Sequence, residues 1–414
     1  MAELHHIHEP EPGASSSPQW NAFLTLGFRP LYLAGTLWAA LSVAIWVYAP
    51  HWLTGTLPGV FWHAHETLWG FVATIAVGFL LTAGATWTQV NPLRGTPLAG
   101  LTSLWLAARI AFLTPGTTAF AIAATCELLF FAWAALALGR AIYQTHNRRN
   151  YGVPWLVLGL GIADGLYLWA AWTENYAVLM PRFATGLLCM AVIALLVSRR
   201  VIPFFAMRAV AGLNIPMHTA SGRWQLASGV LAILFLLFDW QPALAIALAI
   251  AGGLTLWQVT SWRPLSVRHV PLLWILYVGY AALGLGLLAA AAQAAGWITR
   301  AAWSVHTIGV AGFSVLIIGM ATRTALGHLG RPLRTDTSIV TSYLLIILAA
   351  ALRLAALAPT GLSLPLLHIS AGLWVLGFLL YLWRFFPMLI RPRVTPPTAT
   401  AIKPGHRTTP KHAS

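Results

Sequence analysis

Twelve long apolar runs constrain this chain more than any other feature of its sequence. A helix needs about 17–25 mostly apolar residues to cross a bilayer. The runs cover residues 30–48, 64–86, 98–113, 118–138, 153–172, 183–198, 224–238, 243–260, 272–292, 303–322, 339–357 and 366–388. Only 8% of the 414 residues are charged, against about 25% in soluble domains. The sequence therefore predicts an all-α, polytopic transmembrane helical bundle of about twelve spans.

The spans divide the chain into three parts. Residues 1–27 are polar and rich in Pro and Ser, which predicts a disordered N-terminal tail. Residues 28–390 form the predicted twelve-span transmembrane domain. Residues 391–414 are rich in Pro and Thr without periodicity, which predicts a disordered C-terminal tail.

Basic residues give the orientation of the spans. With an even number of spans, 20 of the 24 Lys and Arg fall on the side of the two termini, and only Arg109, Arg182, Arg300 and Arg353 fall on the other. Cytoplasmic loops carry the excess of Lys and Arg, so both termini are predicted to be cytoplasmic. The net charge of +15 is then a topology signal. The expected partner is the lipid bilayer and not a nucleic acid, and the sequence indicates no protein partner.

Polar residues gather near the outer ends of several spans. His63, His65 and Glu66 open the second span, His306 the tenth and His368 the twelfth, while Arg109 and Arg353 end the third and eleventh. Ionisable groups inside a membrane are costly, and they are functional by default. We expect these residues to form one layer near the outer face.

Imidazole is the usual protein ligand for haem iron, copper and zinc. A haem also needs apolar walls and cations for its propionates, which gives His65, His306, His368, Arg109 and Arg353 as candidate haem-binding residues. The simpler alternatives are hydrogen-bonded interfacial histidines and arginines that extend toward water. The convergence of four histidines beside a carboxylate favours a cofactor or metal.

Helix geometry divides the His63-Ala64-His65-Glu66 motif. His63 and His65 are two residues apart, about 200° around a helix, so they serve different sites unless the helix begins after His63. His63 and Glu66 are expected to share a face. The repeat of Trp62-x-x-His65 in Trp303-x-x-His306 suggests His65 and His306 as haem ligands. His63, Glu66 and His368 are then left for copper or for a second axial position.

Other ionisable residues lie away from this layer. On the inner side, His328 with Arg323 and Arg331 is either an anion or second metal site or a basic loop that closes a helix. Glu127 and Asp164 lie deeper in the membrane. They either relay protons or pair with a hydrogen-bond donor such as Tyr167.

Several stretches resemble the NnrS family of membrane proteins over roughly residues 20–390. They are Arg29-Pro30, His63-Ala64-His65-Glu66, Gly70-Phe71, residues 78–83, 104–109 and 200–205, and residues 322–332 around Leu326-Gly327-His328-Leu329-Gly330-Arg331-Pro332. Leu329 stands where the family motif has Thr, so a hydroxyl is missing there.

The resemblance implies a haem- and copper-containing protein of a bacterial inner membrane, linked to nitric oxide tolerance and denitrification. Composition and spacing alone indicate only a metal or haem layer. Two other functions remain open: a proton- or metal-coupled transporter, and a redox enzyme that acts on nitric oxide.

Overall fold

The computed structural model describes residues 17–394, and its core is a bundle of twelve helices that are long and apolar enough to cross a membrane. Single helices form ten of these spans: α2 (Phe28–Tyr48), α5 (Thr96–Leu113), α6 (Thr117–Gln144), α7 (Val153–Trp172), α8 (Leu179–Ala209), α9 (Thr219–Leu237), α10 (Gln241–Ser261), α11 (Pro271–Ala294), α14 (Thr337–Ala355) and α15 (Ser363–Leu389). The second and tenth spans are each built from three consecutive segments. The predicted all-α bundle of twelve spans is confirmed.

Successive spans run in opposite directions, so the described chain begins and ends on the same side of the bundle. The amide of Gln19 donates to the carbonyl of Ile390, at 2.9 Å. Cytoplasmic termini remain a prediction. The predicted tails, 1–27 and 391–414, lie mostly outside the described residues, although the short helix α1 (Trp20–Phe23) falls within the first of them.

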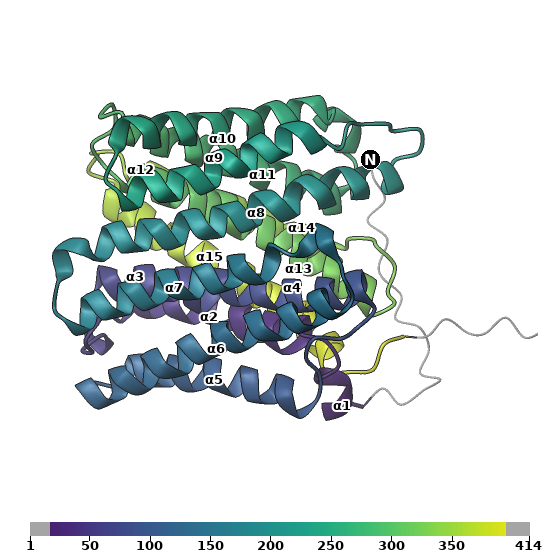
Figure 1. Cartoon of the computed structure of the whole chain (residues 1–414), viewed down its shortest axis with the longest axis horizontal. Helices are drawn as coiled ribbons and strands as arrows, with labels where there is room; N and C mark the ends of the chain where they lie inside the picture. Colours follow the sequence, from purple (N-terminus) through teal and green to yellow (C-terminus); the bar gives the residue numbers. More distant parts are fainter. Residues whose placement is uncertain (1–16, 395–414) are drawn as a thin grey trace, which may run out of the picture.

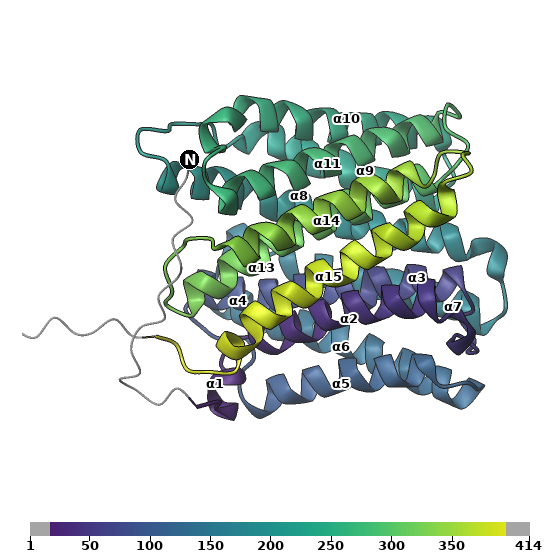
Figure 2. The same ribbon diagram turned by 180° about the vertical axis from the view of Figure 1, so that it is seen from behind.

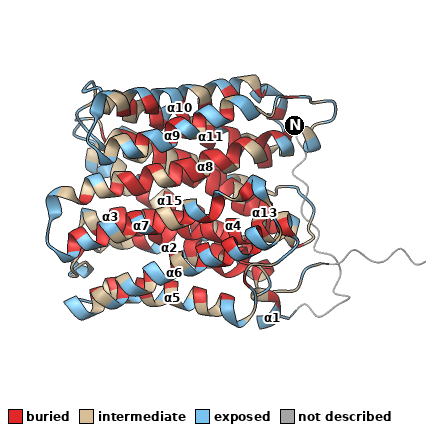
Figure 3. Cartoon of the chain, in the orientation of Figure 1, coloured by how far each residue is buried: buried red, intermediate tan, exposed pale blue. Residues whose placement is uncertain are grey.

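The bundle is a broad slab of parallel and antiparallel helices (Figure 1). Helices α5 and α6 lie along one edge, and α9 and α10 lie along the opposite edge. From the other side, α14 and α15 cross the middle of the slab (Figure 2). Buried residues concentrate in the central helices (Figure 3), and the second span is the most enclosed of the twelve. Its side chains therefore face other helices on all sides.

The second and tenth spans share an unusual construction. The second consists of α3 (Val60–His65), the π-helix η2 (Glu66–Ala73) and α4 (Thr74–Thr88). The tenth consists of α12 (Ala302–His306), the π-helix η6 (Thr307–Ser314) and α13 (Val315–His328). Each π-helix begins directly after a predicted ligand, His65 or His306. π-Helical turns are rare and frequently occur at functional sites.

Two helices extend beyond their apolar runs. The sixth run was predicted to end at residue 198, yet α8 continues through Arg199 and Pro203 to Ala209. Likewise α13 continues through Arg323 to His328. The two extensions meet where the guanidinium of Arg323 lies 3.7 Å from the centre of the Phe205 ring. Charge marks the end of the apolar stretch, but it does not end a helix.

Asp336 caps the N-terminus of α14, and replacing it tests how much this cap stabilises the protein. Its carboxylate accepts from the amide of Ile339 at 3.0 Å and from Nε of Arg384 on α15 at 2.7 Å. Partial burial raises the pKa of Asp336, but the hydrogen bonds from Ser338, Ile339 and Arg384 outweigh it and hold the pKa below its ordinary value. We expect Asp336→Ala to destabilise the protein by about 1 kcal/mol through loss of the cap, measured by thermal unfolding in detergent.

The matched control is Asp336→Asn, which keeps the cap and removes the charge. This variant should lose less stability than Asp336→Ala. Because the pKa of Asp336 is lowered on folding, its stabilisation is present at neutral pH and disappears as the pH falls through that lowered pKa. Equal melting of wild type and Asp336→Ala at pH 7 would contradict the capping role.

Candidate functional site

A cluster of charged side chains is buried among the first five spans. It contains His65 and Glu66 on the second span, Arg109 on α5, Glu127 on α6 and Asp164 on α7, all at most 2% exposed. Each lies within about three helical turns of the same end of the bundle. Three carboxyl groups therefore share one enclosed space with one guanidinium and one imidazole.

Arg109 connects two of the carboxylates. Its Nη1 donates to Oε2 of Glu66 at 2.7 Å, and its Nη2 donates to Oε2 of Glu127. The indole of Trp38 on α2 also donates to Oε2 of Glu66, at 2.6 Å. Buried charges are stable only when they are paired and hydrogen-bonded. Arg109 thus fixes α5 and α6 to the second span.

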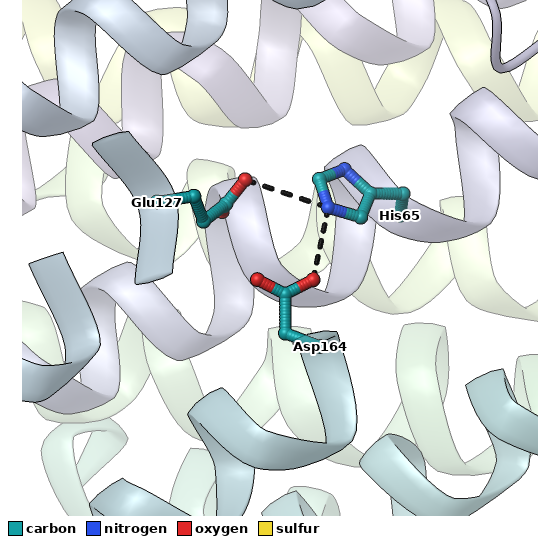
Figure 4. A group of neighbouring side chains, drawn as sticks. All are labelled: His65, Glu127 and Asp164. Atoms are coloured by element: carbon teal, nitrogen blue, oxygen red, sulfur yellow. Dashed lines mark hydrogen bonds and ion pairs between the residues drawn. The ribbon is translucent and has the colours of Figure 1, made fainter. Parts of the chain in front are cut away.

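His65 lies between the remaining oxygens. Its Nδ1 donates to Oε1 of Glu66 at 2.9 Å, while its Nε2 is 3.1 Å from Oδ1 of Asp164 and 3.4 Å from Oε2 of Glu127 (Figure 4). The ring contacts Phe112 edge to face and stacks on Tyr167, with ring centres 4.6 and 5.8 Å away. Both nitrogens of His65 therefore face carboxylate oxygens, and its ring contacts two aromatic side chains.

A glycine makes room for this network. A Cβ placed at Gly70 would overlap Nη1 of Arg109, and it would lie 2.8 Å from the Trp38 nitrogen and 2.9 Å from Oε2 of Glu66. The carbonyl of Gly70 accepts from the indole of Trp105 at 3.1 Å. The close approach of Arg109 to the π-helix η2 requires a residue without a side chain at position 70.

A separate cavity lies on the other side of the second span, between it and the tenth span. Its volume is about 220 Å³, and both π-helices contribute to its walls. Most of the lining is apolar, and its aromatic side chains are Trp46, Phe71, Phe183, Phe313 and Trp374. His63, His306 and Arg353 are the titratable residues that line it. The cavity therefore combines apolar walls with two imidazoles and one guanidinium.

The two histidines of this cavity have different environments. His306 donates from Nδ1 to the carbonyl of Ala302 at 2.7 Å, which leaves Nε2 as the free nitrogen. The ring of His63 stacks on Trp46, with centres 5.4 Å apart. Its Nδ1 is buried without a hydrogen-bond partner among the described residues. Both rings therefore have a nitrogen available for a metal, and His63 has one that lacks any other partner.

The structure separates several residues that the sequence grouped together. His63 and His65 lie on opposite sides of the second span, in agreement with their 200° offset. His306 shares the cavity with His63, and the structure does not bring His65 and His306 together. Glu66 contacts His65 and not His63, because Arg109 and Trp38 hold its carboxylate on the cluster side. Arg109 is enclosed by this network and is not available for a propionate.

The other two predicted histidines lie outside both sites. His368 is half-buried on α15 and is not among the cavity-lining residues. Its Nδ1 donates to the carbonyl of Leu364 at 2.9 Å, and its own carbonyl accepts from the hydroxyl of Tyr48. His328 lies at the opposite end of the bundle, with its ring 5.6 Å from that of Phe28. Of the histidines predicted to form one layer, the structure therefore places His63, His65 and His306 at the two sites and His368 outside them, and His328 lies at the opposite end of the bundle.

The family model described as NnrS protein matches residues 22–393, nearly all of the chain. The chain belongs to the NnrS family. No curated protein matched it. The match includes every residue of the cluster and of the cavity, so both sites lie in the part that this chain shares with the NnrS model.

Some residues of the NnrS-family cluster were not assigned to it from the sequence. Glu127 and Asp164 were left open between proton relay and local pairing, and Trp38 was not singled out. Charge balance offered a signal, because the acidic groups of α6 and α7 and the arginine of α5 lie in neighbouring spans. Ionisable groups inside a membrane pair with one another, which could have identified Arg109 as a partner for Glu127, although Arg109 was predicted from the sequence to bind a haem propionate.

Gly70→Ala tests the packing of the cluster. The added methyl group must displace Arg109, Trp38 or Glu66. We expect the free energy of unfolding to fall by about 1–3 kcal/mol, as for other overpacked sites. Gly253→Ala is the matched control, since a Cβ there meets nothing within 4 Å. It should be neutral or slightly stabilising, because Ala favours a helix over Gly by up to about 1 kcal/mol. Thermal unfolding in detergent measures both, and a Gly70→Ala variant as stable as wild type would contradict the packing.

Proposed function

We propose that this NnrS-family chain is a haem- and copper-binding protein of a bacterial inner membrane that acts in the response to nitric oxide. The family membership supports the membrane location and the link to nitric oxide. The observation that carries the haem proposal is the cavity with two imidazoles, His63 and His306, on the two π-helical spans.

The residues of the cavity fit a haem by their chemistry. An axial histidine commonly bonds a backbone carbonyl through one nitrogen and the metal through the other. His306 has this arrangement, with Nδ1 on Ala302 and Nε2 free. The unpartnered Nδ1 of His63 supplies a second donor. Arg353 would balance a propionate, and the aromatic walls would cover the faces of the ring.

The roles of the surrounding side chains follow from this arrangement. When bound, a haem supplies an iron that coordinates nitric oxide. The apolar walls admit a small uncharged gas and exclude water, since they offer few hydrogen-bonding groups. Trp46 keeps the His63 ring in one orientation by stacking on it. The carbonyl of Ala302 does the same for His306.

Copper rests on the family resemblance alone. Imidazoles suit copper as well as haem iron, but within the described residues only two histidines line the cavity. The remaining donor group, His65 with Glu127 and Asp164, is rich in carboxylates, which favour harder ions. We therefore propose copper as a second metal without assigning its ligands.

Replacing the cavity histidines tests the haem proposal. We expect His63→Ala and His306→Ala each to lower haem content and to change the Soret band, because each removes a metal donor from the cavity. His51→Ala is the control, since His51 is exposed and lies outside the cavity. Absorbance spectra and haem assays on purified protein measure this. Unchanged haem in both cavity variants would overturn the assignment.

The link to nitric oxide needs its own measurement. Addition of nitric oxide to the reduced protein should shift the Soret band of wild type and of His51→Ala. Bacteria that depend on this protein should grow more slowly under nitric oxide when they carry His306→Ala. Consumption of nitric oxide by purified protein with an electron donor would identify a redox enzyme. A protein with haem but no response in any of these assays would contradict a role in the nitric oxide response.

The buried charged cluster favours one other function, a proton- or metal-coupled transporter. Carboxylates that exchange protons inside a membrane are common in transporters. Metal-driven or proton-driven uptake into proteoliposomes, without a tightly bound chromophore, would support this alternative over the haem proposal.

A further inference from the structure

The cluster around His65 has the spacing of a metal site. His65 Nε2 lies 3.1 Å from Oδ1 of Asp164 and 3.4 Å from Oε2 of Glu127, and the three ligand atoms all lie within 4.8 Å of one another. Metal bonds of about 2.0–2.2 Å at tetrahedral or octahedral angles place neighbouring ligand atoms about 3.0–3.5 Å apart. Figure 4 shows the imidazole and the two carboxylates pointing toward a common centre. The two distances from His65 therefore match those between neighbouring ligands of a small metal ion.

The surroundings of His65 match those of a metal-binding histidine. Such a histidine usually donates its second ring N–H to a carboxylate, which fixes the orientation of the ring. His65 donates from Nδ1 to Glu66, and Glu66 is itself held by Arg109 and Trp38. The nitrogen that faces Glu127 and Asp164 is therefore the one that remains for a metal. Glu66 acts as a positioning residue.

The charges in the cluster call for a divalent cation. Three carboxylates and one guanidinium leave an excess of two negative charges when His65 is neutral, and an isolated buried charge costs several kcal/mol. A proton on His65 removes only one of these charges. One divalent ion removes both. The second oxygen of Asp164, Oδ2, is buried without a hydrogen-bond partner among the described residues, and Asp164 is fully buried. This oxygen is therefore available as a metal ligand.

We propose that His65, Glu127 and Asp164 bind one divalent first-row metal ion of the Fe²⁺, Mn²⁺ or Zn²⁺ class. One imidazole with two carboxylates is a set of borderline and hard donors, which suits these ions better than Cu⁺. The site is separate from the cavity of His63 and His306, because it lies on the opposite side of the second span. It binds its metal whether or not the cavity holds a haem.

The test uses purified full-length protein that has been treated with a chelator and then given Mn²⁺ or Zn²⁺ alone. We expect about one ion to bind per chain. Electron paramagnetic resonance measures the bound Mn²⁺, and elemental analysis measures the bound Zn²⁺. Asp164→Asn removes a ligand charge with little change of shape. Changes around a metal site that spare the ligands cost about 10–100-fold in affinity, so Asp164→Asn should weaken binding by about 100-fold or more. Glu66→Gln should weaken it less, because the amide oxygen of the new side chain still accepts from His65.

Two controls separate this site from general damage. Asp336→Asn changes a carboxylate far from the cluster and should bind the metal as wild type does. The Soret band of Asp164→Asn reports separately on the cavity and on folding. Wild-type protein that takes up neither ion overturns the proposal, and the cluster is then neutralised by protons. Equal binding by wild type and Asp164→Asn overturns it too. Uptake of Cu⁺ in place of Mn²⁺ and Zn²⁺, lost in Asp164→Asn, overturns the assigned class of ion.

Discussion

The buried contact of Arg109 with Glu66 and Glu127 is the interaction on which the rest of the site depends. A guanidinium without these partners would be an unpaired charge inside an apolar bundle, and loss of one partner of a buried pair costs about 3–5 kcal/mol. The contact joins three spans, and His65 and Asp164 extend it to a fourth. The same contact fixes the direction in which the Glu66 carboxylate points. Since the carboxylate is held on the side of α5 and α6, it is not available to His63.

The second span therefore separates two chemical environments, one at His63 and the other at His65, only two residues further along the sequence. On one side, charged residues balance one another in a closed cluster. On the other side, two imidazoles face an apolar cavity. The π-helix η2 begins at the residue that follows His65, and it widens the turn from which both sides are formed. Its counterpart η6 follows His306 in the same way. Both π-helices line the cavity, so the two irregular segments meet where the proposed haem site lies.

Most of the fold could be predicted from hydrophobic length. The twelve apolar runs predicted the twelve spans, and the alternation of basic residues between the two sides predicted that successive spans run in opposite directions. The site could be predicted only in part, because the second span is apolar on nearly every face. A pattern of that kind does not show which side carries Glu66, and it contains no signal for a π-helix. The repeat of Trp62-x-x-His65 in Trp303-x-x-His306 correctly marked two similar segments. It did not reveal that His306 faces the cavity whereas His65 faces the cluster.

The central claim is that the cavity and the cluster are independent sites on opposite sides of one helix. The most direct measurement is the haem content and the divalent metal content of His63→Ala and Asp164→Asn, prepared in parallel. We predict that His63→Ala loses haem and keeps the divalent metal, and that Asp164→Asn does the reverse. If each variant lost both cofactors, or if neither lost one, the account of two separate sites would be contradicted.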